Sequence, residues 1–205
     1  MLLYSLEAGA FAANCYLAAC EKTRHGILID PGAEAERILR MVREKEITVD
    51  YIACTHGHID HIGAAAAVKR ALNAPLYIHQ ADSGMLRHPH DALGFYGDKA
   101  EPAEPDGFLE EGGELSFGSV TLKVLSTPGH SPGSICLQGE GILFSGDTLF
   151  AGSIGRTDFP GGNFAQIISS IKTKLLVLPE ETVVYPGHGP ATTIGEEKRY
   201  NPFLR

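Results

Sequence analysis

The chain has 205 residues, of which 43% are hydrophobic and 20% are charged, and its formal net charge at pH 7 is −8. This composition is typical of a folded domain and argues against intrinsic disorder, while the negative charge and the lack of a dense Lys/Arg run argue against nucleic-acid binding. No apolar run reaches the ~18 residues of a membrane span, so we expect no membrane association. Residues 1–7 lack the cationic and apolar segments of a signal peptide, and we expect a cytoplasmic protein.

Short apolar runs separated by turn residues predict three strands at 2–7, 14–19 and 26–30. Apolar residues at helical spacing then predict an amphipathic helix that ends near Lys45. A strand at 51–55 leads directly into a histidine-rich segment, and a helix at 62–72, a strand at 76–79 and a helix at 80–87 follow. This order predicts helices that lie on a sheet.

Residues 88–113 lose this periodicity and are rich in Pro, Gly and acidic residues. We expect a surface excursion there, either an exposed loop or a homodimer contact, with the border of a substrate pocket as the alternative. Strands at 114–117, 120–126, 134–138 and 141–144, a helix at 164–178 and a strand at 182–185 complete the chain. Because no linker divides these elements, we predict a single domain over residues 1–205.

The segment from Thr55 to His61 carries four side chains that can bind metal within six positions: His56, His58, Asp60 and His61. Residues two apart in an extended segment point the same way, so His56 and His58 can reach one ion. Asp60 and His61 come as the chain turns into a helix and are better placed for a second ion. The segment therefore predicts two neighbouring metal sites.

Three later strand ends supply the remaining ligands. His130 and His188 each follow a strand and a Pro-Gly turn, and Asp147 follows the strand at 141–144. Because a carboxylate can bridge two ions, we predict one site of His56, His58, His130 and Asp147, and a second of Asp60, His61, His188 and Asp147. Nitrogen and oxygen ligands without thiolate suit divalent zinc, our first expectation, and also iron or manganese.

The motifs around these residues resemble those of the metallo-β-lactamase fold superfamily over nearly the whole chain. They are the T-H-x-H-x-D-H segment, Pro128-Gly129-His130, Ser145-Gly146-Asp147-Thr148 and Pro186-Gly187-His188. The resemblance implies an α+β fold, a four-layer αββα sandwich of two mixed sheets packed face to face with helices outside. It also implies the same seven metal ligands.

Within that superfamily, residues 146–158 and 187–195 resemble the short, single-domain relatives of glyoxalase II, the hydroxyacylglutathione hydrolases. The resemblance implies a hydrolase that cleaves an acyl-glutathione or similar small-molecule thioester with a metal-bound hydroxide. Asp60 is then the catalytic residue, which orients the hydroxide and later accepts its proton.

The sequence also departs from glyoxalase II. Full-length members carry a C-terminal extension that grips glutathione, whereas this chain ends 17 residues after His188. Arg156 and Asp158 stand where that family has a Lys and a Tyr. Arg156 is therefore a candidate anchor for a substrate carboxylate, with an ion pair to Asp158 as the alternative. Asp30, in an Asp-Pro-Gly turn, is a candidate partner of the ligands, or an ordinary turn residue.

Two other functions remain open. Persulfide dioxygenases have similar motifs, including a segment like Gly-Arg-Thr-Asp at 155–158, and imply one iron held by His56, His130 and Asp147. A non-catalytic metal-binding module would be expected to lose ligands, yet all seven are present here. Nothing beyond the shared fold points to β-lactam cleavage.

Overall fold

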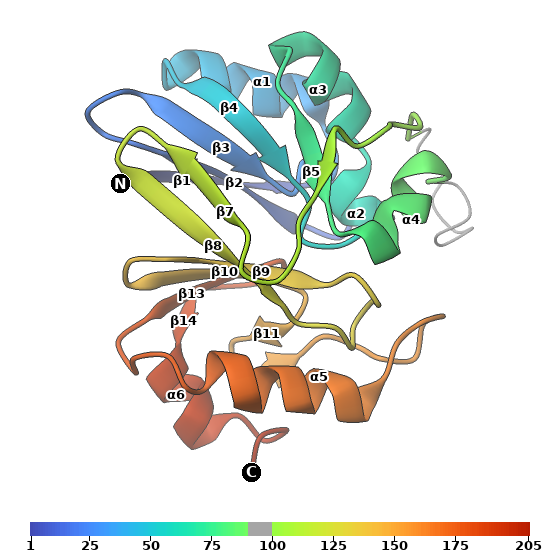
Figure 1. The fold of residues 1–205 in the computed structure, drawn as a ribbon, viewed down its shortest axis with the longest axis vertical. Coiled ribbons are helices and arrows are strands. Elements are labelled where there is room, and N and C mark those ends of the chain that lie inside the picture. Colours follow the sequence, from blue (N-terminus) through green and yellow to red (C-terminus); the bar gives the residue numbers. More distant parts are fainter. Residues whose placement is uncertain (90–99) are drawn as a thin grey trace.

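The computed structural model describes residues 1–89 and 100–205. Two six-stranded sheets face one another, and helices cover the outer face of each (Figure 1). The fold is the αββα sandwich that the motifs imply. Within the two described ranges, no helix is long and apolar enough to cross a membrane.

The first sheet has the strand order β1-β2-β3-β4-β5-β6. Its strands are β1 (Leu2–Ala8), β2 (Ala13–Ala19), β3 (His25–Ile29), β4 (Thr48–Ala53), β5 (Leu76–Ile78) and β6 (Gly107–Phe108). The first three pair antiparallel, and β3 to β6 pair parallel. The parallel crossovers place α1 (Ala35–Glu44) and α3 (Ala65–Leu72) on the outer face of the sheet.

The second sheet has the strand order β14-β13-β10-β9-β8-β7. Its strands are β7 (Glu114–Phe117), β8 (Val120–Ser126), β9 (Ile135–Gly139), β10 (Ile142–Gly146), β13 (Val183–Pro186) and β14 (Thr192–Thr193). A small pair, β11 (Leu149–Phe150) and β12 (Ser153–Ile154), lies between β10 and the helices α5 (Phe164–Ser170) and α6 (Ile194–Tyr200).

Three apolar layers hold the sandwich together, and β2 shows how strand alternation builds two of them. Leu17 belongs to the layer between the first sheet and its helices, while Tyr16 and Ala18 belong to the layer between the sheets. The third layer joins the second sheet to α5 and α6. Between the sheets the Tyr16 ring packs 5.3 Å from Phe144, measured between centroids. Because β2 is buried on both faces, it is a fixed platform for the loops above it.

The helix predicted at 62–72 is divided in the structure. A short helix, α2 (Ile59–Ile62), contains Asp60 and His61, and α3 begins only at Ala65. The turn at residues 31–32 packs against this break: Ala64 donates a backbone hydrogen bond to Pro31 (2.9 Å), and a Cβ on Gly63 would lie 2.4 Å from the Gly32 carbonyl oxygen. The close contact fixes the direction of α2, and so of the two candidate ligands on it.

The excursion predicted at 88–113 is only partly a loop. Residues 90–99 lie outside the described residues, but Gly107–Phe108 forms the edge strand β6, and Ala100 and Leu109 are buried. Local periodicity does not reveal β6, because this strand is short and depends on its pairing with β5. The segment therefore completes the first sheet.

The helices predicted at 80–87 and 164–178 also differ in detail. The first is a 3-10 turn (Gln80–Asp82) that continues into α4 (Ser83–Arg87). The second is α5 followed by a π-helical turn (Ile171–Leu175), and at the junction Ser170 Oγ donates to the Pro128 carbonyl (2.8 Å). This contact attaches the helix to the turn that precedes His130.

Candidate metal centre

All seven predicted ligands follow the ends of strands at one place in the sandwich. The segment after β4 carries His56 and His58, and α2 carries Asp60 and His61; the turns after β8, β10 and β13 carry His130, Asp147 and His188. Their ligand atoms fall into three overlapping groups, each with all atoms within 4.8 Å: His56, His58 and His130; His56, His61 and Asp147; and Asp60, His61 and His188. The structure thus brings the seven residues together.

Asp147 lies between the two predicted sets of histidines. Its Oδ1 is 3.3 Å from His61 Nε2, and its Oδ2 is 3.5 Å from both His130 Nε2 and His188 Nε2. A carboxylate that faces both sets at once has the position expected of a bridging ligand.

Two histidines are held in a defined tautomer by backbone carbonyls. His130 Nδ1 lies 2.7 Å from the Arg156 carbonyl oxygen, and His188 Nδ1 lies 3.1 Å from the Phe11 carbonyl oxygen. Because a carbonyl can only accept, both Nδ1 atoms carry the hydrogen. Nε2 is therefore the atom of His130 and of His188 that faces the cluster.

Asp30 orients two more histidines, one directly and one through Thr55. Its carboxylate accepts hydrogen bonds from the Thr55 N–H (2.7 Å), the Thr55 hydroxyl (2.7 Å) and His61 Nδ1 (3.0 Å). Since the hydroxyl donates to Asp30, its oxygen is free to accept from His56 Nδ1 at 3.1 Å. The turn at Asp30 thus aims His56 Nε2 and His61 Nε2 inward, an arrangement often found behind metal ligands.

Buried acceptors without donors show that the cluster suits a cation. Among the described residues, His56 Nε2 and Asp147 Oδ1 are buried side-chain atoms without a hydrogen-bond partner. Such atoms are costly to leave unsatisfied inside a protein. Nitrogen lone pairs and carboxylate oxygens that converge on one volume fit divalent metal ions, because an ion would satisfy them together.

The protonation states of the histidines in the cluster also favour a bound cation. Burial is the main cause that lowers the pKa of His58 to about 4, and the nearby His130 and His61 add to it. Burial is also the main cause that lowers the pKa of His56 well below its usual value, and the neighbouring histidines again add to it. Both rings are therefore neutral near pH 7. Burial opposes a proton on His61, but Asp147 and Asp30 outweigh it and raise the pKa of His61. The field that favours a proton there also favours a metal cation.

Gly187 is required at the centre for steric reasons. A Cβ at this position would lie 2.1 Å from Asp147 Oδ1 and 2.7 Å from His61 Cε1. The turn before His188 is tied to the first sheet by Asn14, whose backbone N–H donates to the Gly187 carbonyl (2.7 Å). A residue without a side chain thus lets the β13 turn approach the ligands closely.

Asp82 supports the site, although no sequence motif pointed to it. It is fully buried, and its carboxylate accepts hydrogen bonds from the Gly57 N–H (2.9 Å), the Ser131 hydroxyl (2.6 Å) and the Gly133 N–H (2.7 Å). Gly57 separates His56 from His58, and Ser131 follows His130. One carboxylate therefore connects the two segments that carry these three histidines. An acidic residue shortly after a strand was the available signal, as it was for Asp30.

A cavity of about 330 Å³ lies over the ligands. Aromatic side chains form much of its wall: Phe159 packs edge-on to His58 with 5.7 Å between centroids, and Phe150 lies 6.1 Å from His188. Phe11 and Arg156 also line it. The cavity can hold a small organic substrate next to the centre.

Arg156 adopts the ion pair that was the alternative to substrate binding, and it also lines this cavity. Its guanidinium makes two hydrogen bonds of 2.7 Å to the carboxylate of Asp158 and lies 3.7 Å from the centroid of the Phe159 ring. The pair lowers the pKa of Asp158 to about 2, and the hydrogen bond from Arg156 is the largest cause of this shift. These contacts hold the guanidinium in the wall of the cavity.

The αββα sandwich and the His/Asp cluster at the strand ends define a metal-binding protein of a known architecture. Residues 8–188 match the family model of the metallo-beta-lactamase superfamily, and the chain belongs to this superfamily.

Several proteins are similar over most of their length. Hydroxyacylglutathione hydrolase GloC of Haemophilus influenzae is 38% identical over 95% of this chain and 94% of its own. Among solved structures, the BLEG-1 B3 metallo-beta-lactamase is 38% identical with a TM-score of 0.90, covering 99% of both chains. TTHA1623 in a di-iron-bound form is 40% identical with a TM-score of 0.89, over 98% of this chain and 100% of that one. ETHE1 from Myxococcus xanthus is 33% identical with a TM-score of 0.80, over 98% and 84%.

Proposed function

We propose that the protein is a metal-dependent thioesterase of the glyoxalase II type, which hydrolyses an acyl-glutathione or a similar thioester. The observation that carries this proposal is the position of Asp147, which faces His61, His130 and His188 at the floor of a cavity. The likeness to GloC supports the reaction, and the likeness to the di-iron form of TTHA1623 supports a centre of two ions.

The two ions would be held as the sequence analysis predicts. His56, His58 and His130 would bind one, Asp60, His61 and His188 the other, and Asp147 would bridge them. When bound, such ions act as Lewis acids and lower the pKa of water toward neutrality. Zinc is our first expectation for this donor set, with iron or manganese as alternatives.

Asp60 is the residue that we propose to handle the proton. Burial opposes its charge, but the hydrogen bond from His188 and the nearby His61 hold the pKa of Asp60 well below its ordinary value. Its carboxylate is therefore ionised near pH 7, and its Oδ2 lies 3.2 Å from His188 Nε2. An ionised acceptor at the cavity floor can orient an attacking water molecule and accept its proton.

Arg156 and the aromatic wall are the groups that we propose to position the substrate. The guanidinium can attract a carboxylate of the thiol portion, and Phe150 and Phe159 offer apolar surface. Water adds to the thioester carbonyl carbon, the carbon–sulfur bond breaks, and the thiolate leaves with the electron pair. Because thiols are acidic, with a pKa of about 8.5 for cysteine, departure needs little help from an acid.

A persulfide dioxygenase is the second candidate. The likeness to ETHE1 fits this alternative, and His56, His130 and Asp147 offer two imidazoles and one carboxylate, the ligand set of non-haem iron oxygenases. Such an enzyme would need one iron and would consume O₂.

Metal analysis of the purified protein, combined with a substrate panel, distinguishes these functions. We expect two ions per chain and hydrolysis of acyl-glutathione without O₂ uptake. One iron per chain with O₂ consumption on glutathione persulfide would instead support the dioxygenase. If a β-lactam were the only compound of the panel that is hydrolysed, the protein would instead be a β-lactamase, the activity in the name of BLEG-1.

Two ligand variants test the centre itself. His58→Ala and Asp147→Asn are expected to lose bound metal and thioesterase activity, whereas His25→Ala retains both. His25 is the matched control because it is exposed and pairs with Asp50 instead of the cluster. Retention of metal and activity in both ligand variants contradicts the assigned centre.

A further inference from the structure

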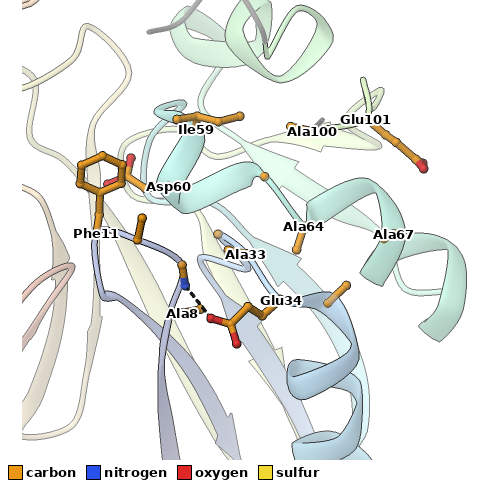
Figure 2. Close-up of a pocket in the computed structure, with 15 residues that line it drawn as sticks. Ala8, Phe11, Ala33, Glu34, Ile59, Asp60, Ala64, Ala67, Ala100 and Glu101 are labelled. Atoms are coloured by element: carbon orange, nitrogen blue, oxygen red, sulfur yellow. Dashed lines mark hydrogen bonds between the residues drawn. The ribbon is translucent and has the colours of Figure 1, made fainter. Parts of the chain in front are cut away.

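A second and larger cavity, of about 550 Å³, lies beside the metal centre (Figure 2). Four parts of the described chain form its walls: the turn between β1 and β2, the segment that leads into α1, the helices α2 and α3 with the residues between them, and residues 100–101. Its described lining residues are Ala8, Gly9, Ala10, Phe11, Gly32, Ala33, Glu34, Ala35, Ile59, Asp60, Gly63, Ala64, Ala67, Ala100 and Glu101. Neither the proposed thioesterase reaction nor the dioxygenase alternative assigns a role to this space.

The cavity adjoins the cavity over the metal ligands. Asp60 and Phe11 line both this cavity and the cavity over the ligands. In Figure 2 their side chains lie next to each other at one end, and Ala67 and Glu101 lie toward the other. A molecule whose reacting atom is at the centre would enter this space by passing Asp60 and Phe11.

The wall suits a slender, uncharged chain. Most of the described lining residues are alanine or glycine, so the space is bounded by backbone and methyl groups. The charged side chains among them are the carboxylates of Glu34, Asp60 and Glu101, so the described wall offers no cation to an anionic occupant. Glu101 pairs with Arg70 at 2.9 Å. Glu34 is already engaged, because it accepts a hydrogen bond from the Gly9 N–H at 2.9 Å and pairs with Arg37.

We propose that this second cavity binds the acyl portion of the substrate, as an unbranched and uncharged alkyl chain. The proposal rests on the thioesterase function and adds a substrate class to it: thioesters of medium-length linear acids. The thiol portion would then lie in the cavity that Arg156 lines, on the other side of the scissile carbon–sulfur bond. The carboxylates of the second cavity and the guanidinium of the first give the two portions different charge preferences.

Binding of non-hydrolysable thioethers tests the cavity without requiring turnover. The probes are S-methyl- and S-octylglutathione, titrated calorimetrically into the metal-containing protein. Each methylene that enters an apolar site strengthens binding by roughly fourfold, so the octyl probe should bind at least ~10-fold more tightly than the methyl probe. An octyl probe that ends in a carboxylate should lose most of that gain.

Narrowing the cavity should remove the preference for the long chain. Ala67→Leu, on α3, should reduce the octyl gain to less than about threefold and leave the affinity for the methyl probe unchanged. Ala71→Leu is the matched control, since Ala71 is exposed on the same helix and does not line the cavity. Ala35→Leu narrows the same cavity from the α1 side. It allows the same comparison of the two probes if Ala67→Leu does not fold.

The outcomes separate this proposal from the proposed function. Equal affinity for both probes in the unaltered protein, or an octyl gain that survives both narrowing variants, overturns the acyl cavity even if acetylglutathione is hydrolysed. An octyl gain that disappears in the narrowing variants supports the cavity. If that pattern occurs while neither acetyl- nor octanoylglutathione is hydrolysed, the thioesterase function fails and the chain-binding site stands.

Discussion

The carboxylate of Asp82 accepts a hydrogen bond of 2.7 Å from the backbone of Gly133, a residue 51 positions further along the chain. The approach is so close that a Cβ on Gly133 would lie 2.6 Å from the Asp82 Cγ. The same carboxylate accepts from Gly57, between two candidate ligands. The relative position of the β4 and β8 turns thus depends on one buried acid.

Asp82→Ala should weaken both stability and metal binding. The change leaves the Gly57 and Gly133 N–H groups without their acceptor. At about 1–3 kcal/mol for each unsatisfied donor, we expect a total loss of roughly 2–6 kcal/mol. Misplaced histidines should also reduce metal affinity by about 10- to 100-fold. Urea unfolding and competition with a chelator measure the two effects.

The control is Asp50→Asn, which alters the surface pair of Asp50 with His25 and should change stability by less than about 0.5 kcal/mol. Equal effects of the Asp82 and Asp50 variants would contradict the role of Asp82.

Asp30→Asn should weaken the ion that His61 is proposed to bind. The amide keeps the shape of the side chain but loses the charge and presents an N–H group to donors from Thr55 and His61. We expect a loss of about 10- to 100-fold in the affinity for one of the two ions. Stepwise chelator titration measures each affinity. Thr55→Ala removes the hydrogen bonds that connect Asp30 to His56 but keeps the contact between Asp30 and His61. This variant should therefore bind the His61 ion more tightly than Asp30→Asn does. Weaker binding of that ion by Thr55→Ala than by Asp30→Asn would disprove the assignment.

Arg156→Ala should change substrate binding without removing the metal. His130 is held by the backbone carbonyl of Arg156, which the substitution preserves, whereas the guanidinium at the cavity is lost. For a thioester with a carboxylate in its thiol portion, we expect KM to rise about 10-fold, the loss of one charge-assisted hydrogen bond. An uncharged thioester, measured in parallel, should show a much smaller change. Loss of metal from this variant would show that the side chain has a structural role instead.

Glu111→Gln should give a pH-dependent loss of stability. Glu111 accepts from the Ser126 N–H at the end of β8 and pairs with Lys174 in the π-helical turn. Burial opposes its charge, but Lys174 and the Ser126 N–H lower its pKa. A carboxyl whose pKa is depressed by folding stabilises the protein above its unfolded pKa, about 4.3, and this contribution is lost as the pH falls through the folded pKa.

Because Glu111 is half exposed and screened by solvent, we expect the variant to lose only about 0.5–1 kcal/mol at pH 7. The difference from the unaltered protein should shrink toward zero below about pH 3. Urea unfolding of both proteins at the two pH values measures this. A difference that persists at low pH would indicate a packing effect in place of the ion pair.

Local sequence patterns predicted most of the sandwich, because strand alternation and helical spacing record which face of an element is buried. Eleven of the longer elements therefore needed no tertiary information beyond shifted ends, as β1, α1 and β8 illustrate. Elements of two residues, such as β6 and β14, have no period to detect. They exist only because a neighbouring strand offers its edge.

The sequence by itself determined the seven candidate ligands, since each stands in a short motif at the end of a predicted strand, where backbone geometry limits the direction of the side chain. The tertiary structure decided what surrounds them: the link from Asp82 to Gly133, the support of His61 by Asp30, the ion pair of Arg156, and the alanine-lined cavity beyond Asp60. These features depend on contacts between segments far apart in the chain. Such contacts leave no local period, so they become visible only when the two sheets are packed together.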